Sequence, residues 1–251
     1  MSMSTVVTGM VLSAMPIGDY DKRVVILTKE IGKISAFAKG ARRPNSALLG
    51  CTQPFTFGKF TLFVGRTSYN INAVAVGNYF SEIRNDLDSM YYGMYFCEFV
   101  DYFTREENNE KEILRLLYVS LLALIKKHIN NEMIRIIFEL KVISLSGLAP
   151  HVFSCVKCNS QSKDYTYSIE SDGIICEGCR AKDVNGIRIM PTTLYSMQYI
   201  IQSEIPKLFS FKVTDVVFKE LDYLISQHKQ KHLDYNFKSY DMLKLILSGK
   251  V

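Results

Sequence analysis

The chain has 251 residues, of which 48% are hydrophobic and 22% charged, and its formal net charge is +5. This composition excludes an intrinsically disordered chain, which has few aromatic and β-branched residues, and the length predicts two or three structural units. The charge is uneven, because residues 1–80 carry a net +6 and the remainder carries −1. Such asymmetry favours an anionic partner, nucleic acid or a membrane surface, although a solvated basic face without function has the same signature.

Neither a membrane span nor a secretory signal is predicted. The longest apolar run, Leu116 to Ile125, has ten residues, about half of the ~20 that cross a bilayer. No Lys or Arg precedes Lys22, so the positively charged start of a secretory signal is missing. We therefore expect a cytoplasmic protein that has no membrane partner.

Residues 1–80 are predicted to form an all-β domain. Glycine and proline separate five short hydrophobic or alternating runs, a pattern typical of a small barrel or sandwich. A barrel of this size fits the oligonucleotide-binding (OB) architecture, and Phe55, Phe57 and Phe60 are expected in its core. The five predicted strands are 6–13, 23–28, 33–39, 57–64 and 68–76.

The third predicted strand runs into a cluster of positive charge. Its inward positions alternate with Ser35, Phe37 and Lys39, and a loop with two adjacent arginines follows between Gly40 and Pro44. OB barrels bind single strands with a basic groove and stacking aromatic rings. Gly40 permits a left-handed backbone and Pro44 restricts the loop. The predicted DNA-binding residues are Lys22, Arg23, Lys33, Phe37, Lys39, Arg42, Arg43 and Arg66, although Arg66 could equally be a solubilising residue.

The hydrophobic period changes to 3.6 residues from Ser81 onward, which predicts a helical domain over 81–251. Apolar stripes mark helices at 94–103, 113–125, 134–145, 213–225 and 242–247, and these stripes are expected to form core. Arg135 and Lys141 are considered for an acidic peptide ligand, but ordinary surface charge is the simpler interpretation.

Four cysteines in an insert at 151–187 give the most specific chemical signal. Two C-x₂-C pairs separated by 17 residues match a zinc template, and a hairpin around Asp172 and Gly173 would bring the pairs together. Four thiolates close the coordination shell, so the predicted Zn²⁺ is structural. Two disulfides, an iron–sulfur cluster and a thioredoxin-like redox pair are less consistent with this context. The predicted ligands are Cys155, Cys158, Cys176 and Cys179.

No catalytic constellation is found, so we expect that the protein is not an enzyme. Phosphate-binding G-x-x-x-x-G-K-[ST], G-x-S-x-G and H-E-x-x-H motifs are absent from the sequence. His228 and His232 have the i, i+4 spacing of a metal pair, but flanking Lys229 and Lys231 favour a solvated basic face. A nuclease would need a carboxylate cluster that the sequence does not reveal.

The stretch "MVLSAMPIGDYDKRVVILTKEIGKISAFAKGARRP", followed by Ser46, Leu49-Gly50 and Gln53-Pro54, resembles the amino-terminal domain of the bacterial recombination mediator RecO. The order of barrel, helical body, cysteine insert and returning helices is similar to that family, as is "KHLDYNFKS" at 231–239. The resemblance covers nearly the whole chain, and the complete cysteine set resembles the zinc-bearing members.

This resemblance implies an ATP-independent protein that binds single- and double-stranded DNA and anneals complementary strands. It implies that RecR is a partner in loading RecA onto DNA gaps, that the C-terminal tail of single-strand binding protein is recognised, and that the protein associates with the nucleoid. The alternative is a zinc-stabilised protein-interaction adaptor without tight DNA binding. The predicted fold class is α+β, with an OB-fold barrel followed by a helical domain that carries the inserted four-cysteine zinc site.

Overall fold

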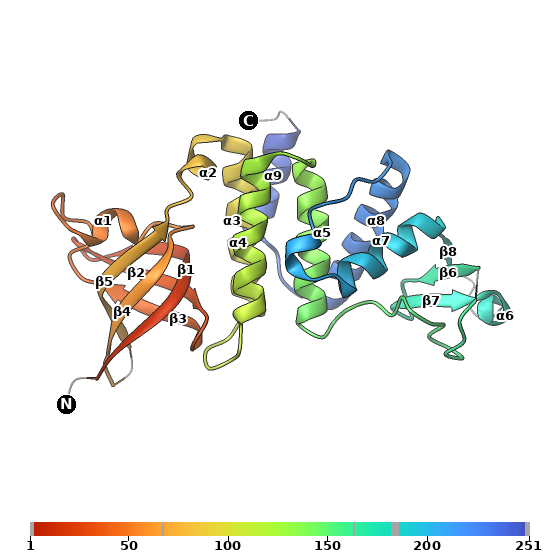
Figure 1. Cartoon of the computed structure of the whole chain (residues 1–251), viewed down its shortest axis with the longest axis horizontal. Coiled ribbons are helices and arrows are strands. Elements are labelled where there is room, and N and C mark those ends of the chain that lie inside the picture. Colours follow the sequence, from red (N-terminus) through yellow and green to blue (C-terminus); the bar gives the residue numbers. More distant parts are fainter. Residues whose placement is uncertain (1–2, 67, 163, 182–185, 249–251) are drawn as a thin grey trace. The chain divides into compact units, whose positions relative to one another are not determined.

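The computed structural model describes residues 3–66, 68–162, 164–181 and 186–248 (Figure 1). The chain divides into two compact units, Met1–Lys126 with Phe237–Val251, and Lys127–Asn236. Among the described residues, no helix has both the length and the apolar character that a membrane span requires.

Five strands close into a barrel in the first unit, in the order β1-β2-β3-β5-β4 (Figure 1). All neighbours are antiparallel except β3 and β5, which pair in parallel. This topology is OB-like and confirms the predicted barrel. The strands are β1 (Met3–Ile17), β2 (Asp21–Thr28), β3 (Gly32–Ala38), β4 (Phe57–Val64) and β5 (Tyr69–Asn78), and the short helix α1 (Leu48–Cys51) lies between β3 and β4.

Alternation along β3 separates the core of the barrel from its outer face. Ile34, Ala36 and Ala38 are buried, whereas Ser35 and Phe37 are half-buried on the other face, as the alternating pattern predicts. Phe60 lies in the barrel core as predicted. Phe55 is buried against Gly93, and Phe57 is only half-buried, with its ring centroid 4.8 Å from that of Tyr118, so the helical segment covers part of what was predicted as barrel core. Strand β1 is longer than predicted: pairing continues through Pro16, opposite Lys22, after a bulge between Val11 and Ser13.

Helices complete the first unit. The stripe of α4 is buried from Ile113 to Leu124 as predicted. Aromatic rings join α3 to the last helix, where the ring centroids of Tyr95 and Tyr240 are 4.8 Å apart and those of Phe99 and Phe237 are 5.0 Å apart. The helices are α2 (Ser81–Asn85), α3 (Leu87–Phe103), α4 (Lys111–Lys126) and α9 (Lys238–Leu247).

The second unit is built on the buried helix α5, against which α7 and α8 pack. The Asn130 side chain caps α5 by accepting a hydrogen bond from the Glu132 N–H at 2.8 Å. A three-stranded sheet of order β7-β6-β8 forms the cysteine insert (Figure 1). The elements of the second unit are α5 (Asn131–Leu145), β6 (Tyr165–Ser168), β7 (Gly173–Cys176), α6 (Glu177–Arg180), β8 (Ile187–Arg188), α7 (Pro191–Gln202), the 3-10 helix η1 (Ile205–Lys207) and α8 (Asp215–His232).

Candidate nucleic-acid interface and metal centre

The loop that follows β3 is held against the β1–β2 turn. The Arg42 N–H donates to the Tyr20 carbonyl at 2.9 Å, and Arg42 Nη1 donates to the Gly18 carbonyl at 3.0 Å. Gly40 has a φ of +65°, which its predicted left-handed role requires. Its N–H donates to Asp21 Oδ1 at 2.7 Å. These bonds order the loop while the side chains of both arginines remain exposed.

Tyr20 is a feature of this loop that the sequence analysis missed. Arg43 Cζ lies 5.0 Å from the centroid of the Tyr20 ring, within the range of a cation–π contact. The tyrosine is 53% exposed, so much of its surface remains accessible. The sequence signal that could have revealed it is an aromatic residue in a tight turn two residues after Gly18.

Three more predicted residues lie at the end of β3 or opposite it. Arg23 and Phe37 occupy opposite positions in the β2–β3 pairing, and both point away from the barrel core. Arg23 Nε donates to Ser35 Oγ at 2.8 Å. Lys39 is exposed directly beyond the strand. The structure therefore brings together five of the eight predicted residues, namely Arg23, Phe37, Lys39, Arg42 and Arg43.

The other three are held by other contacts or lie in another loop. Lys22 lies opposite Ala38 and close to Arg42, but its Nζ donates to Thr52 Oγ1 at 3.2 Å, and partial burial lowers the pKa of this amine. Lys33 forms an ion pair of 2.9 Å with Asp101 of α3. Arg66 is exposed in the β4–β5 loop, beside the start of β1, whereas the turn containing Tyr20 follows the end of β1.

The four cysteines of the insert converge on one point. Their Sγ atoms all lie within 4.8 Å of one another, and the Cys158 and Cys176 Sγ atoms are 3.6 Å apart. Metal–sulfur bonds near 2.3 Å in a tetrahedron separate the sulfurs by about 3.8 Å, so the donor set fits a metal ion. A tight turn forms the first pair, since the Asn159 N–H donates to the Cys155 carbonyl at 2.8 Å. The β6–β7 hairpin returns the second pair, as predicted.

Hydrogen bonding prepares part of this site for metal binding. Burial raises the pKa of the Cys155 thiol, but bonds from three backbone N–H groups outweigh it and lower the net pKa to about 6. Hydrogen bonding with Cys158 and Cys176 raises the pKa of Cys179 to about 12. A metal ion would displace the remaining thiol protons, because the thiolate is the ligand. The group could thus hold one ion with four sulfurs.

Two interpretations of charged side chains in the second unit are wrong. Arg135 and Lys141 are 4% and 6% exposed, so neither is ordinary surface charge. Arg135 contacts Glu139 at 3.1 Å and Asp222 at 2.6 Å, and Lys141 Nζ donates to the carbonyls of Ile201 and Ser203 at the end of α7. The predicted solvated face at His228 is also wrong, because this histidine is 5% exposed. Tertiary contacts, which local charge patterns do not reveal, bury these groups.

Comparison with known proteins gives one consistent family. The model of the recombination protein O N terminal domain matches residues 1–80, and that of the C terminal domain matches residues 84–241. The DNA repair protein RecO of Alkaliphilus metalliredigens is 35% identical, with 95% of this chain and 98% of the relative covered. RecO of Acetivibrio thermocellus is 33% identical over 95% of this chain and 96% of the relative. The chain therefore belongs to the RecO family of DNA repair proteins.

Proposed function

We propose that the protein is a DNA-binding and strand-annealing recombination mediator that acts without ATP hydrolysis. The observation that carries this proposal is the ordered, exposed arrangement of Tyr20, Arg42 and Arg43 at one end of an OB-like barrel. In the proposed organisation, residues 1–80 bind nucleic acid, and residues 81–251 form a helical domain with the zinc insert at 151–187.

Phosphate contacts are the first part of the mechanism. Each Lys or Arg that neutralises a DNA phosphate releases a condensed counterion, which makes the affinity depend on salt. Arg42 and Arg43 are exposed on a loop whose backbone is hydrogen-bonded to the β1–β2 turn. An ordered loop loses less conformational entropy on binding than a flexible one. We therefore assign direct phosphate contacts to these two arginines, with Lys39 and Arg23 extending the track.

Stacking is the second part. Tyr20 and Phe37 present aromatic surface beside the basic residues, and base–aromatic stacking tolerates every base because each base has a π-face. Little sequence preference is expected. Lys22, Lys33 and Arg66 remain predicted DNA-binding residues. Lys22 is half-buried, the charge of Lys33 is paired with that of Asp101, and Arg66 lies in another loop, so we assign these three to the general positive potential.

Annealing follows from the same electrostatics. A cationic surface that holds two strands lowers their mutual repulsion and raises their local concentration, so complementary bases meet sooner. Single- and double-stranded DNA would both bind, since both present phosphates. We propose that the protein recognises the tail of single-strand binding protein on coated DNA gaps and acts there with RecR to load RecA. DNA as the ligand would also place the protein on the nucleoid.

The metal centre has a separate, structural role in this proposal. Zn²⁺ bound by Cys155, Cys158, Cys176 and Cys179 would cross-link the ends of the insert and leave no ligand position for substrate. The insert has a small apolar cluster around Ile175, so metal binding would supply much of its order. No chemical step is assigned to this centre, and we propose that the protein is not an enzyme.

An annealing assay tests the proposal. Complementary oligonucleotides labelled with a fluorophore and a quencher are mixed with the full chain, with no nucleoside triphosphate present. Faster quenching than in its absence, for several unrelated sequences, supports annealing. The same strands are then coated with single-strand binding protein. Failure to accelerate naked strands, together with weak binding that salt does not change, would reject the proposal in favour of the protein-interaction adaptor.

A further inference from the structure

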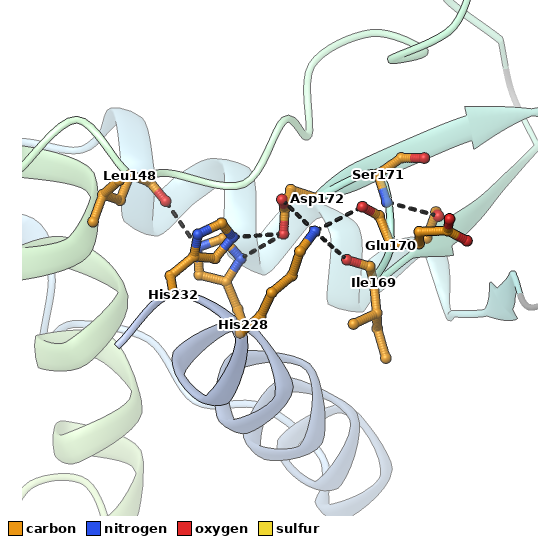
Figure 2. Close-up of polar contacts among 9 residues, drawn as sticks. Leu148, Ile169, Glu170, Ser171, Asp172, His228 and His232 are labelled. Carbon is orange, nitrogen blue, oxygen red and sulfur yellow. Dashed lines mark hydrogen bonds and ion pairs between the residues drawn. The ribbon is translucent and has the colours of Figure 1, made fainter. Parts of the chain in front are cut away.

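A second group of side chains of the types that ligate metals lies apart from the four cysteines. Asp172 lies in the β6–β7 turn, and His228 and His232 lie one helical turn apart near the end of α8 (Figure 2). Asp172 Oδ1 is 2.8 Å from His232 Nε2 and 3.5 Å from His228 Nδ1. The three ligand atoms all lie within 4.8 Å of one another.

The hydrogen bonding of His228 leaves one ring nitrogen directed at this group. Figure 2 draws the contact between His228 Nε2 and the Leu148 carbonyl, whose length is 2.8 Å. A carbonyl only accepts, so Nε2 carries the proton. The lone pair of the neutral ring is then on Nδ1, which is buried. Among the described residues, Nδ1 has no hydrogen-bond partner. An unpaired buried nitrogen that faces a carboxylate oxygen is unfavourable unless a cation or a proton lies between them.

Protonation of His228 Nδ1 is unfavourable at neutral pH. Burial lowers the pKa of His228, so its neutral form is favoured. We propose that Asp172, His228 and His232 bind a divalent transition-metal ion of the Zn²⁺, Co²⁺ or Ni²⁺ class. Two imidazole nitrogens and one carboxylate oxygen suit these ions, and the fourth position would be open to water.

Both histidine–aspartate pairs need only small adjustment to hold the ion, which would replace the proton that His232 Nε2 donates to Asp172 Oδ1. Bonds of about 2.0–2.2 Å in a tetrahedron separate the ligand atoms by about 3.3–3.5 Å. The His228–Asp172 separation already has that value, and the His232–Asp172 separation must widen by about half an ångström. The Leu148 carbonyl holds the His228 tautomer, as second-sphere acceptors of metal-bound histidines do.

Lys231 both supports the site and limits its affinity. Its Nζ contacts Asp172 Oδ2 at 2.6 Å and donates to the carbonyls of Glu170 and Ile169. This arrangement orients the carboxylate so that Oδ1 faces the histidines. The ammonium charge also repels a bound cation, so this ion should bind more weakly than the one at the four cysteines. The two sites lie at opposite ends of β7, and the second would tie the hairpin turn to α8.

Calorimetry tests the inference on the full chain. The protein is purified with its tightly bound metal, dialysed and titrated with ZnCl₂, and we expect it to bind one further equivalent of Zn²⁺. His232→Gln should weaken the affinity for that equivalent about tenfold or more. His128→Gln, at an exposed histidine, should leave the affinity unchanged. Cys158→Ser should lower the tightly bound metal without removing the weaker equivalent, which separates this site from the proposed zinc centre.

A measurement on the unmodified protein covers the case in which His232→Gln does not fold. The chain has four histidines, and His151 is not a reference because its backbone N–H donates to the Asp172 carbonyl at 2.7 Å. Added Co²⁺ should broaden the imidazole NMR signals of His228 and His232 before that of His128. Absence of a further equivalent of bound metal, or equal broadening of the His128, His228 and His232 signals, would overturn the inference.

Discussion

The buried carboxylate of Glu139 should be essential for the stability of the second unit. Glu139 is 0% exposed and forms ion pairs with Arg135 at 3.1 Å and Lys229 at 2.6 Å. Glu139→Gln preserves the shape but leaves two nearly buried cations without this negative charge. Arg135 keeps Asp222 as a partner at 2.6 Å. Removing one partner from a buried ion pair costs about 3–5 kcal/mol, and we expect a loss of this size in the free energy of unfolding.

Urea denaturation followed by far-UV circular dichroism would measure this loss, with Glu112→Gln as the matched control. Glu112 is exposed and lies 4.0 Å from Arg115, so its substitution should cost about 0–1 kcal/mol. Adding Lys229→Met to Glu139→Gln should recover part of the loss, since one of the two cations is removed. A loss below about 1 kcal/mol for Glu139→Gln, or no coupling in the double variant, would refute the reasoning.

Three further outcomes are expected. Cys158→Ser should reduce the bound zinc and speed amide exchange in β7, measured by metal analysis and hydrogen exchange; unchanged metal content would contradict the assignment of four cysteine ligands. Because burial lowers the folded pKa of His228 below its unfolded value, the unfolding free energy should be full above about pH 6.5 and fall as the pH drops toward the folded pKa, without added metal. His228→Gln should flatten that dependence, and an unchanged slope would argue against it. At Gly32, which has a φ of +71°, an added Cβ would overlap the Arg105 carbonyl, whereas at Gly18 it would meet open space. Gly32→Ala should therefore lower the free energy of unfolding by about 3 kcal/mol and Gly18→Ala by about 1 kcal/mol. Equal losses in thermal unfolding would contradict the packing around Gly32.

Local patterns predicted most of the fold because they are set by residues close in sequence. The period-2 alternation around Ile34 and Ala36 identified the buried face of β3, and the 3.6-residue stripe of Leu117 and Leu121 identified α4. The spacing of the cysteines similarly predicted the cluster, because a turn and a hairpin are local structures. Strand β1 was predicted too short because proline normally ends a strand, whereas pairing with β2 continues past the bulge between Val11 and Ser13 through Pro16 and Ile17.

Contacts between distant segments could not be predicted in this way. Lys33 looked like part of a basic strand, but its partner Asp101 is on a helix 68 residues later. His228 looked solvated beside two lysines, but Leu148 and Asp172 bury it from other elements. Charge in a sequence indicates which residues can form ion pairs, whereas the tertiary fold decides which residues do.

The salt dependence of DNA binding tests the central claim most directly. Fluorescence anisotropy with a single-stranded oligonucleotide, titrated from about 50 to 200 mM salt, would compare the unmodified chain with the Arg42→Gln, Arg43→Gln double variant. Glutamine retains a donor near the Gly18 carbonyl, and Lys59→Gln, at an exposed lysine of β4, is the control. Each lost phosphate contact lowers the slope of log K against log salt by about 0.7 for single strands. We predict weaker binding with a slope reduced by about 1.4 in the double variant alone; unchanged affinity and slope would contradict the assignment of this loop as the DNA-binding surface.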